Sequence, residues 1–319
     1  MTMLRMLGLG LVALVAATFS APTSTSAQNY PSQRVTIVVP FGAGSVTDIM
    51  ARIIAEEASK RWGQQVVVEN RPGLAGTTGV AKATPDGYTL MLTSNGHTVA
   101  GIVNKNLSFD PVKDFAGITR ICSAPLYLIV NPDVPAKNLK ELIDLAKAKP
   151  GTLNFSSPGL ASTTFIAGAL FRKAAGINIV HVPFKSAPDA VTAVVRGDVQ
   201  MYFAPVNLSK EMAEAGKVRA IAAATPQRIP DMPNVPTFKE AGLDFAYDSW
   251  FGLMAPAGVP RPVVEKINHD IVQILQSPEV KARLAAQFVI GVTDTPAQFD
   301  KIIKHETANL TEVLKQASN

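Results

Sequence analysis

The sequence predicts an α/β protein of two domains, each a mostly parallel β-sheet flanked by helices. Apolar β-branched runs alternate with amphipathic segments along the chain, in two blocks. The chain has 319 residues, 47% of them hydrophobic, which suits two cores better than one. The proline-dense segment 225–243 has the composition of a crossing between domains. Two facing α/β domains would form a cleft between them.

The first 27 residues have the three-part form of a secretory signal. Arg5 precedes an apolar run over residues 6–19, and small residues follow as far as Ala27. The run is short for a bilayer, so a membrane anchor is the less favoured alternative. We expect cleavage near Ala27 and a mature protein that is soluble and lies outside the cytoplasm. Cleavage removes one basic residue and no acid, so the net charge falls from +5 to +4, and this modest excess does not favour a nucleic-acid partner.

The first block predicts a β-α-β unit followed by a second helix and a third strand. Such a unit favours parallel strand pairing with a right-handed crossover. Gly63 ends the first helix, and the Asp86-Gly87 turn opens the third strand. In order, the predicted segments are strand 34–41, helix 46–62, strand 64–70, a helix within 71–83 and strand 86–94.

The second block continues the alternation, and amphipathic helices end the chain. Gly176 stands just beyond one predicted helix, and Pro262 begins the first of three C-terminal helices. We assign residues 28–125 and 226–319 to a first, discontinuous domain and residues 126–225 to a second. The predicted segments of the second block are strand 124–132, helix 138–149, strand 152–157, helix 164–176, strand 177–184, helix 189–197 and strands 199–205 and 217–225.

A glycine-containing turn, "PFGAGSVTD", leads from the first strand into the first helix. Such turns aim backbone N–H groups at an anion. Ser45 and Asp48 have the spacing of a capping box, which alone could account for Asp48. In the functional interpretation, the capped turn also leaves the amides of residues 43–46 free for a carboxylate or its bound water.

The same turn invites comparison with a dinucleotide-binding fingerprint. Gly42 and Gly44 follow a strand, and Glu69 ends the next one. However, Thr47 stands where the third glycine belongs, and Phe41 places a bulky ring at the mouth of the turn. An exported protein also meets little NAD, so we disfavour a dehydrogenase and expect no cofactor.

The second block contains a similar strand–loop–helix stretch, "NFSSPGLASTTFIAG", with a cluster of hydroxyl side chains. No acid occupies the first turn of its helix, so the positive helix end is not neutralised from within. Ser162 or Thr163 could simply be the N-cap. For the cluster as a whole we favour contact with a carboxylate: Ser156, Ser157, Ser162, Thr163 and Thr164.

Polar residues after the third strand give a further candidate contact. Ser94, Asn95 and His97 stand at this strand end, where His97 could donate to a ligand or could only pack. The four histidines and the single Cys122 show no metal-ligand spacing, so we expect no metal, and Cys122 suits a buried apolar position. No nucleophile elbow or phosphate loop is present, and we do not expect an enzyme, although triads are built from distant residues.

Taken together, these stretches resemble the substrate-binding receptors of tripartite tricarboxylate transporters, the Bug-type periplasmic receptors. The matching stretches run in the family's order over nearly the whole mature chain. They are "YPSQRVTIVVPFGAGSVTDIMAR", "QQVVVENRPGLAGTTG", "ATPDGYTL", "LNFSSPGLASTT", "HVPFKSAPDA", "VPTFKEAGL" and "WFGLMAPAGVP".

The resemblance implies a two-domain periplasmic-binding-protein (Venus-flytrap) fold that closes on a carboxylate-bearing solute. In that family, backbone N–H groups of the first turn and ordered waters hold one carboxylate, and the second loop faces the other end of the ligand. Gly42, Ala43 and Ser45 depart from the commoner pattern of the turn. Carried onto this chain, the positions are Phe41, Gly42, Ala43, Gly44, Ser45, Thr47 and Asp48 in the turn, and residues 156–163, Gly159 included, in the second loop.

The resemblance also places Phe203 and Ala204 at the border of the cleft. The family often has an acid there that can select amino-group ligands, so Phe203 favours a plain or aromatic dicarboxylate over an amino acid. The expected partners are membrane subunits of a tripartite transporter, served by a monomeric receptor. A periplasmic sensor partner shares the binding step and stays open as an alternative, as does an exported enzyme.

Overall fold

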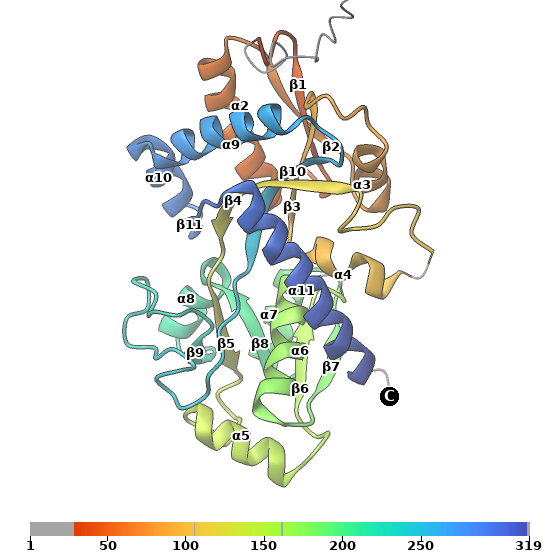
Figure 1. Cartoon of the computed structure of the whole chain (residues 1–319). Helices are drawn as coiled ribbons and strands as arrows, with labels where there is room; N and C mark the ends of the chain where they lie inside the picture. The colour runs from red at the N-terminus through yellow and green to blue at the C-terminus, as the bar shows by residue number, and fades with distance from the viewer. Residues whose placement is uncertain (1–28, 105, 161, 318–319) are drawn as a thin grey trace, which may run out of the picture.

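The computed structural model describes residues 29–104, 106–160 and 162–317, which form two β-sheets with helices on their faces (Figure 1). The predicted signal peptide, residues 1–27, lies outside the described residues. Within these ranges, no helix combines the length and the apolar character that a membrane crossing requires.

The first sheet has six strands in the order β11-β4-β10-β3-β1-β2. Helices α2, α9 and α10 cover one face, and α3 and the start of α11 pack on the other. The strands are β1 (Val35–Val39), β2 (Val66–Asn70), β3 (Thr89–Ser94), β4 (Phe115–Ser123), β10 (Trp250–Pro256) and β11 (Ile290–Gly291). The helices are α2 (Val46–Trp62), α3 (Leu74–Ala81), α4 (Gly96–Val103), α9 (Arg261–Gln276), α10 (Pro278–Ala285) and α11 (Pro296–Ala317).

The second sheet has five strands in the order β7-β6-β8-β5-β9. Helices α5 and α6 pack on one face, and α7 and α8 pack on the other. The strands are β5 (Leu126–Val130), β6 (Asn154–Ser157), β7 (Val180–Pro183), β8 (Met201–Pro205) and β9 (Arg219–Ala223). The helices are α5 (Leu139–Ala148), α6 (Thr163–Ala175), α7 (Ala187–Arg196) and α8 (Val206–Glu214).

Both sheets are mixed, whereas the sequence predicted mostly parallel ones. β1 pairs in parallel with β2 and β3, but β10 runs antiparallel to β3 and β4. In the second sheet, β6 is parallel to β7 and β8, while β5 is antiparallel to β8 and β9. The reason is the path of the chain between domains. A strand that returns from the other domain, as β10 does, enters at the edge where β3 ends and must run the opposite way.

The segment after β9 packs with the second domain, which corrects the predicted boundary at residue 226. Thr237 forms a bridge with Ala223, and the amide of Tyr247 donates to the carbonyl of Ala224 (2.9 Å). Phe238 lies in the core of the second domain. The proline-dense segment is thus not the crossing itself. The chain crosses at residues 124–125 and 248–249, which we call the hinge, and the amide of Ala124 donates to the carbonyl of Ser249 there (2.8 Å).

Helix α11 belongs to both domains. It begins on the first sheet, where Phe299 and Ile303 pack with Trp250. Its later residues Leu310 and Val313 lie in the core of the second domain. Figure 1 shows it in blue, running from beside β4 down past α4 to α6. The domain boundaries predicted from the sequence place this helix wholly in the first domain.

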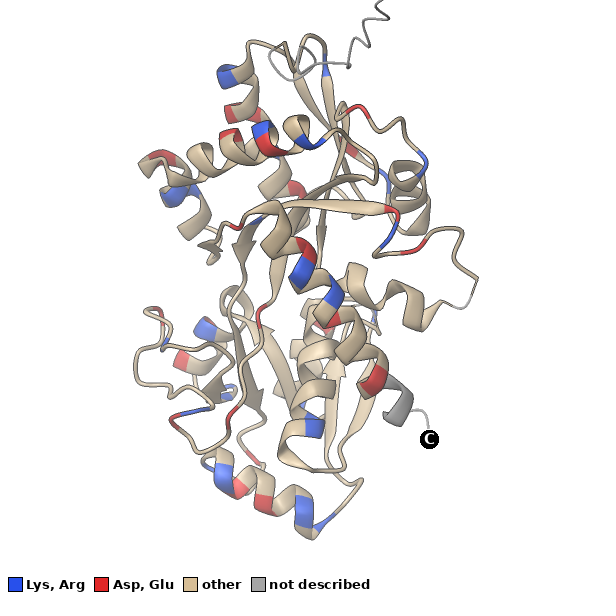
Figure 2. Ribbon diagram, in the orientation of Figure 1, with Lys and Arg blue, Asp and Glu red and all other residues tan. Residues whose placement is uncertain are grey.

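Charges on the outer helices are mixed in sign. Figure 2 shows Lys and Arg interspersed with Asp and Glu on α5 and on the helices of the first domain. Several are ion pairs one helical turn apart, such as Lys60 with Glu56 on α2 and Lys140 with Asp144 on α5. Exposed pairs of this kind contribute little to stability.

Candidate functional site

The carboxyl ends of the parallel strands in both sheets face the hinge. In the first sheet β3 ends at Ser94, and the amide of the next residue, Asn95, donates to the carbonyl of Trp250 just after the hinge (3.2 Å). Because β1 is parallel to β3, the turn after β1 lies at the same edge. In the second sheet Leu126, which follows the hinge, pairs with Pro205 at the end of β8. Because β6 is parallel to β8, the loop after Ser157 also lies at the hinge edge.

Asp48 holds the turn after β1 together. The hydroxyl of Ser45 accepts from the Asp48 amide (3.2 Å), and the Asp48 carboxylate accepts from the Gly44 amide (2.9 Å). Arg52 Nε and Asn70 Nδ2 also donate to this carboxylate, both at 3.0 Å. Burial raises the pKa of Asp48, but the hydrogen bonds from Arg52, Gly44 and Asn70 outweigh it and lower the pKa below its usual range. The predicted cap at Ser45 is therefore present, and Asp48 serves the turn itself.

These internal bonds decide which amides of the turn remain for a ligand. The amides of Gly44 and Ser45 are taken, since Ser45 N donates to the carbonyl of Gly42 (3.2 Å). Within the described ranges, no acceptor is found for the amides of Ala43, Val46 and Thr47. The expectation that residues 43–46 are all free is thus corrected to these three. They stand at the N-terminus of a helix of 17 residues, where anions are favoured.

The loop between β6 and α6 is shaped by its own serines. Ser162 is the N-cap of α6, accepting from the Phe165 amide (3.1 Å) and donating to the carbonyl of Gly159 (2.7 Å). The hydroxyl of Ser157 accepts from the Gly159 amide (3.1 Å) and lies 2.7 Å from Nε2 of His181. As predicted, no acid stands in the first turn of α6. Ser162 and Thr163 are partly exposed at this helix end.

Ser156 and Ser157 point into the domain, contrary to the expectation that their hydroxyls touch a ligand. Both have no exposed surface. Ser156 donates to the carbonyl of Ala190 on α7 (3.0 Å). Their hydrogen bonds position the loop before α6.

Phe203 and Ala204 lie in the core and not at a cleft border, which corrects the position carried over from the family. Neither has exposed surface. The ring of Phe203 packs against those of Phe171 and Phe238, at 5.7 and 6.0 Å between centroids. Ala204 faces the opposite core. The reason is that β8 is an inner strand with helices on both of its faces.

The polar residues after β3 also serve structure. His97 is buried, its Nε2 lies 2.7 Å from the carbonyl of Pro111, and its ring packs edge-on against Phe115 (4.7 Å). Burial lowers the pKa of His97 to about 4. Asn95 is buried at the hinge, and Ser94 pairs with Phe251 inside the sheet. The His97 ring and the Asn95 amide thus have hydrogen-bond partners within the fold.

His181 is the residue of this region that the sequence analysis missed. It lies between the rings of Phe155 and Phe165, at 5.0 and 4.6 Å, and contacts Ser157. Burial lowers the pKa of His181 to about 4, so it is a poor general base for Ser157. No carboxylate orients its other nitrogen within the described chain. In the sequence, only the motif "HVPF" could have drawn attention to His181.

Cys122 has the buried position that the sequence predicted. It is a free cysteine with no exposed surface, and burial raises the pKa of its thiol. Among the described residues, no three His, Cys, Asp or Glu side chains gather as metal ligands would.

Two sheets joined by a double crossing, with helix N-termini turned toward that crossing, define a periplasmic solute-binding protein. Solved structures of similar proteins superpose on this fold. The R. palustris protein Rpa4515 with adipate superposes with a TM-score of 0.75 and 31% identity, over 91% of this chain and 98% of that one. MatC from Rhodopseudomonas palustris with bound malate gives 0.73 and 31%, over 89% and 99%.

The family model of the tripartite tricarboxylate transporter family receptor, TctC, matches residues 50–318, and the chain belongs to this family. BugT of Bordetella pertussis is 32% identical over 322 residues, which cover 99% of this chain and 98% of BugT. The predicted family, fold class and receptor function are confirmed. This is a family of solute-binding receptors and not one of enzymes.

Proposed function

We propose that this receptor binds a small dicarboxylate between residues 43–47 of the first domain and residues 159–163 of the second. After export and cleavage near Ala27, it passes this solute to the membrane subunits of its transporter. The observation that carries the proposal is a pair of capped helix N-termini, those of α2 and α6, at the two sheet edges that face the hinge.

Neither segment contains Lys or Arg, so the recognition is by backbone dipoles and hydroxyls. Arg52 is the nearby cation, and it is engaged by Asp48 (2.9 Å). The three free amides at the N-terminal end of α2 and in the turn before it suit one carboxylate, and the acid-free start of α6 suits a second. A ligand with two carboxylates contacts both domains at once and so stabilises the closed state. Release stays easy because no ion pair has to be broken. Relatives whose structures hold adipate and malate support a dicarboxylate.

Adipate and malate are expected to bind the mature protein, and acetate to bind at least about tenfold more weakly, because it fills only one helix end. Isothermal titration calorimetry measures these affinities directly.

Ser162→Ala should weaken adipate binding about 2- to 10-fold, since the cap that orients the α6 amides is lost. NMR of the same mixtures should show no conversion of the ligand.

The matched control is Ser277→Ala, which removes the N-cap of α10, where the hydroxyl accepts from Val280 N (3.2 Å). This variant loses a similar N-cap, but the cap lies on the outer side of the first domain. The affinity for adipate should therefore not change. Equal adipate affinities for Ser162→Ala and Ser277→Ala would show that the α6 loop is not part of the binding site. Binding of acetate as tight as that of adipate would refute the two-ended recognition.

His181 is expected to act on affinity through its hydrogen bond to Ser157. His181→Leu should weaken adipate binding about 2- to 10-fold, the value of one hydrogen bond. His181→Gln should retain most of the affinity, because its amide can reach the same hydroxyl. His269→Leu, on the exposed side of α9, is the control. If glutamine proves as damaging as leucine, the ring fills space and does not position the loop.

A further inference from the structure

Asp48 places a buried negative charge in the turn that we propose binds a carboxylate. Its side chain is 4% exposed, and its carboxylate accepts from the Gly44 amide (2.9 Å). The amide of Ala43, one residue before Gly44, is among those left for the solute. Two carboxylates held on neighbouring amides of one turn repel each other. The charge of Asp48 by itself would therefore disfavour an anion at this turn.

Arg52 supplies the opposite charge. It stands one helical turn after Asp48 on α2, and its Nε and Nη2 bind the two carboxylate oxygens at 3.0 and 2.9 Å. Asn70, at the end of β2, accepts from Arg52 Nη2 with its Oδ1 (3.1 Å) and donates to Asp48 with its Nδ2 (3.0 Å). The same Nδ2 donates to the carbonyl of Phe41 (3.2 Å), which ties this ring of hydrogen bonds to the start of the turn.

Other charges near the Asp48 carboxylate are few. Within the described ranges, Arg52 is the only cation that forms an ion pair with it. The neighbouring elements β1, β3 and α3 contain no charged residue. The charged residues that approach from β2, α9 and α10 are paired with one another or with later residues of α2: Glu69 with Arg71, Asp270 with Arg61, and Arg283 with Glu56. The charge at the turn is therefore decided by one ion pair.

We propose that Arg52 is the counter-ion that allows this turn to accept a carboxylate. The inference rests on the proposed function and adds Arg52 as a positioning residue, one that acts on the solute through Asp48. With Arg52 in place, the pair has no net charge, and the anion meets only the amides at the N-terminus of α2. The affinity for a dicarboxylate then depends on the charge balance between Arg52 and Asp48, and not only on the shape that their hydrogen bonds give to the turn.

Isothermal titration calorimetry with adipate at pH 7 tests this charge balance. Arg52→Gln leaves the carboxylate of Asp48 without its counter-ion and should weaken adipate binding about tenfold, because a buried charge beside the anion is poorly screened. The double variant Asp48→Asn/Arg52→Gln restores neutrality. It should recover most of the affinity that Arg52→Gln loses, although it breaks more of the hydrogen bonds in the turn. A purely structural role of Arg52 predicts the reverse, a double variant weaker than the single one.

The pH dependence of adipate binding gives an independent readout. Burial raises the pKa of Asp48, but the hydrogen bonds from Arg52, Gly44 and Asn70 outweigh it, so Asp48 is charged at neutral pH. Loss of Arg52 raises this pKa, and protonation of Asp48 then removes the repulsion. The ratio of the Kd of Arg52→Gln to that of the wild type should therefore fall from about ten at pH 7 toward one as the pH is lowered to 4.5. The titration of adipate itself is common to both proteins and cancels in the ratio.

The matched control is Arg61→Gln, which breaks a similar ion pair at the other end of α2. Arg61 Nε lies 2.9 Å from Oδ1 of the buried Asp270. The adipate affinity of this variant should equal that of the wild type at both pH values, and its Tm reports the cost of a broken pair.

Three results would overturn the counter-ion role of Arg52. They are an Arg52→Gln variant that binds adipate as tightly as the wild type, a double variant no better than Arg52→Gln, and a Kd ratio that stays constant with pH. Failure of the wild type itself to bind adipate would instead refute the proposed dicarboxylate site, and this inference with it.

Discussion

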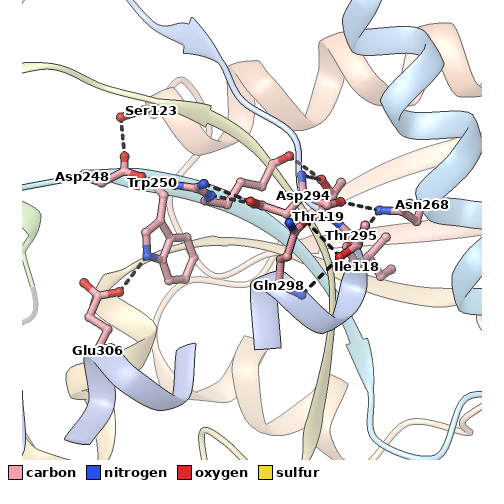
Figure 3. A network of polar contacts seen from close by, with 11 residues as sticks. Ile118, Thr119, Ser123, Asp248, Trp250, Asn268, Asp294, Thr295, Gln298 and Glu306 are labelled. Atoms are coloured by element: carbon pink, nitrogen blue, oxygen red, sulfur yellow. Dashed lines mark hydrogen bonds and ion pairs between the residues drawn. The ribbon is translucent and has the colours of Figure 1, made fainter. Parts of the chain in front are cut away.

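Replacing Arg120 with leucine is expected to destabilise the protein by about 3–5 kcal/mol, because it leaves a buried carboxylate without its counter-ion. The Arg120 side chain is 16% exposed, and its guanidinium binds both oxygens of Asp294, which is 8% exposed, at 2.6 and 3.0 Å. It also pairs with Asp248 of the hinge. Figure 3 shows both acidic partners, Asp248 and Asp294, in one network of polar contacts.

Urea unfolding of Arg120→Leu measures the effect, and the exposed pair of Arg228 and Glu240 supplies the control. Both of these partners are 46% exposed, so Arg228→Leu should cost about 1 kcal/mol at most. Adding Asp294→Asn to Arg120→Leu should recover a large part of the loss, since it removes the uncompensated charge. If Arg120→Leu costs no more than the control, the ion pair is not a support of the hinge.

Substituting Gly252 with alanine is expected to cost about 3 kcal/mol, at the upper end for an overpacked core. A Cβ at this position would lie 2.3 Å from Cζ and 2.8 Å from Cε1 of the buried Phe299 ring. That ring is held edge-on against Trp250, with centroids 5.0 Å apart, so it cannot simply turn away. Close approach of α11 to β10 therefore requires glycine at this position.

The test is a double-mutant cycle with Phe299→Leu, measured by urea unfolding. The smaller side chain should absorb part of the new methyl group, so the double variant should be less destabilised than the sum of the single ones. Gly101→Ala on α4 is the control, because its Cβ would meet Pro111 at an ordinary 3.6 Å. Additive effects of Gly252→Ala and Phe299→Leu would show that the ring is not the obstacle.

Half of the candidate site could be predicted from local patterns. The caps at Ser45 and Ser162 and the acid-free start of α6 follow from residues within one turn of each other. The error at Phe203 has a different origin. The alternation of residues along β8 does not reveal that helices cover both faces of this strand. Phe203, which the family resemblance places at a cleft border, is therefore packed in the core. His181 was missed because it is 24 residues away from Ser157.

The same limit explains the elements that the sequence analysis did not predict. β4 contains Arg120 in the middle of a buried strand, a pattern that no local rule favours. Its charge is met by Asp248 and Asp294, which are 128 and 174 residues away. α4 has 8 residues and no side-chain cap, so its local signal is weak.

What the sequence determined by itself is short-range: most of the helices and strands, the caps at Ser45 and Ser162, and which strand ends carry amides for an anion. These follow from backbone hydrogen bonds and side chains a few residues apart, whose energies do not depend on the rest of the fold. Only the tertiary structure decided the directions of β5 and β10, the position of the hinge and the partners of Arg120. Those depend on contacts between groups that are far apart in the sequence, because burial and long-range ion pairs exist only once both domains are in place.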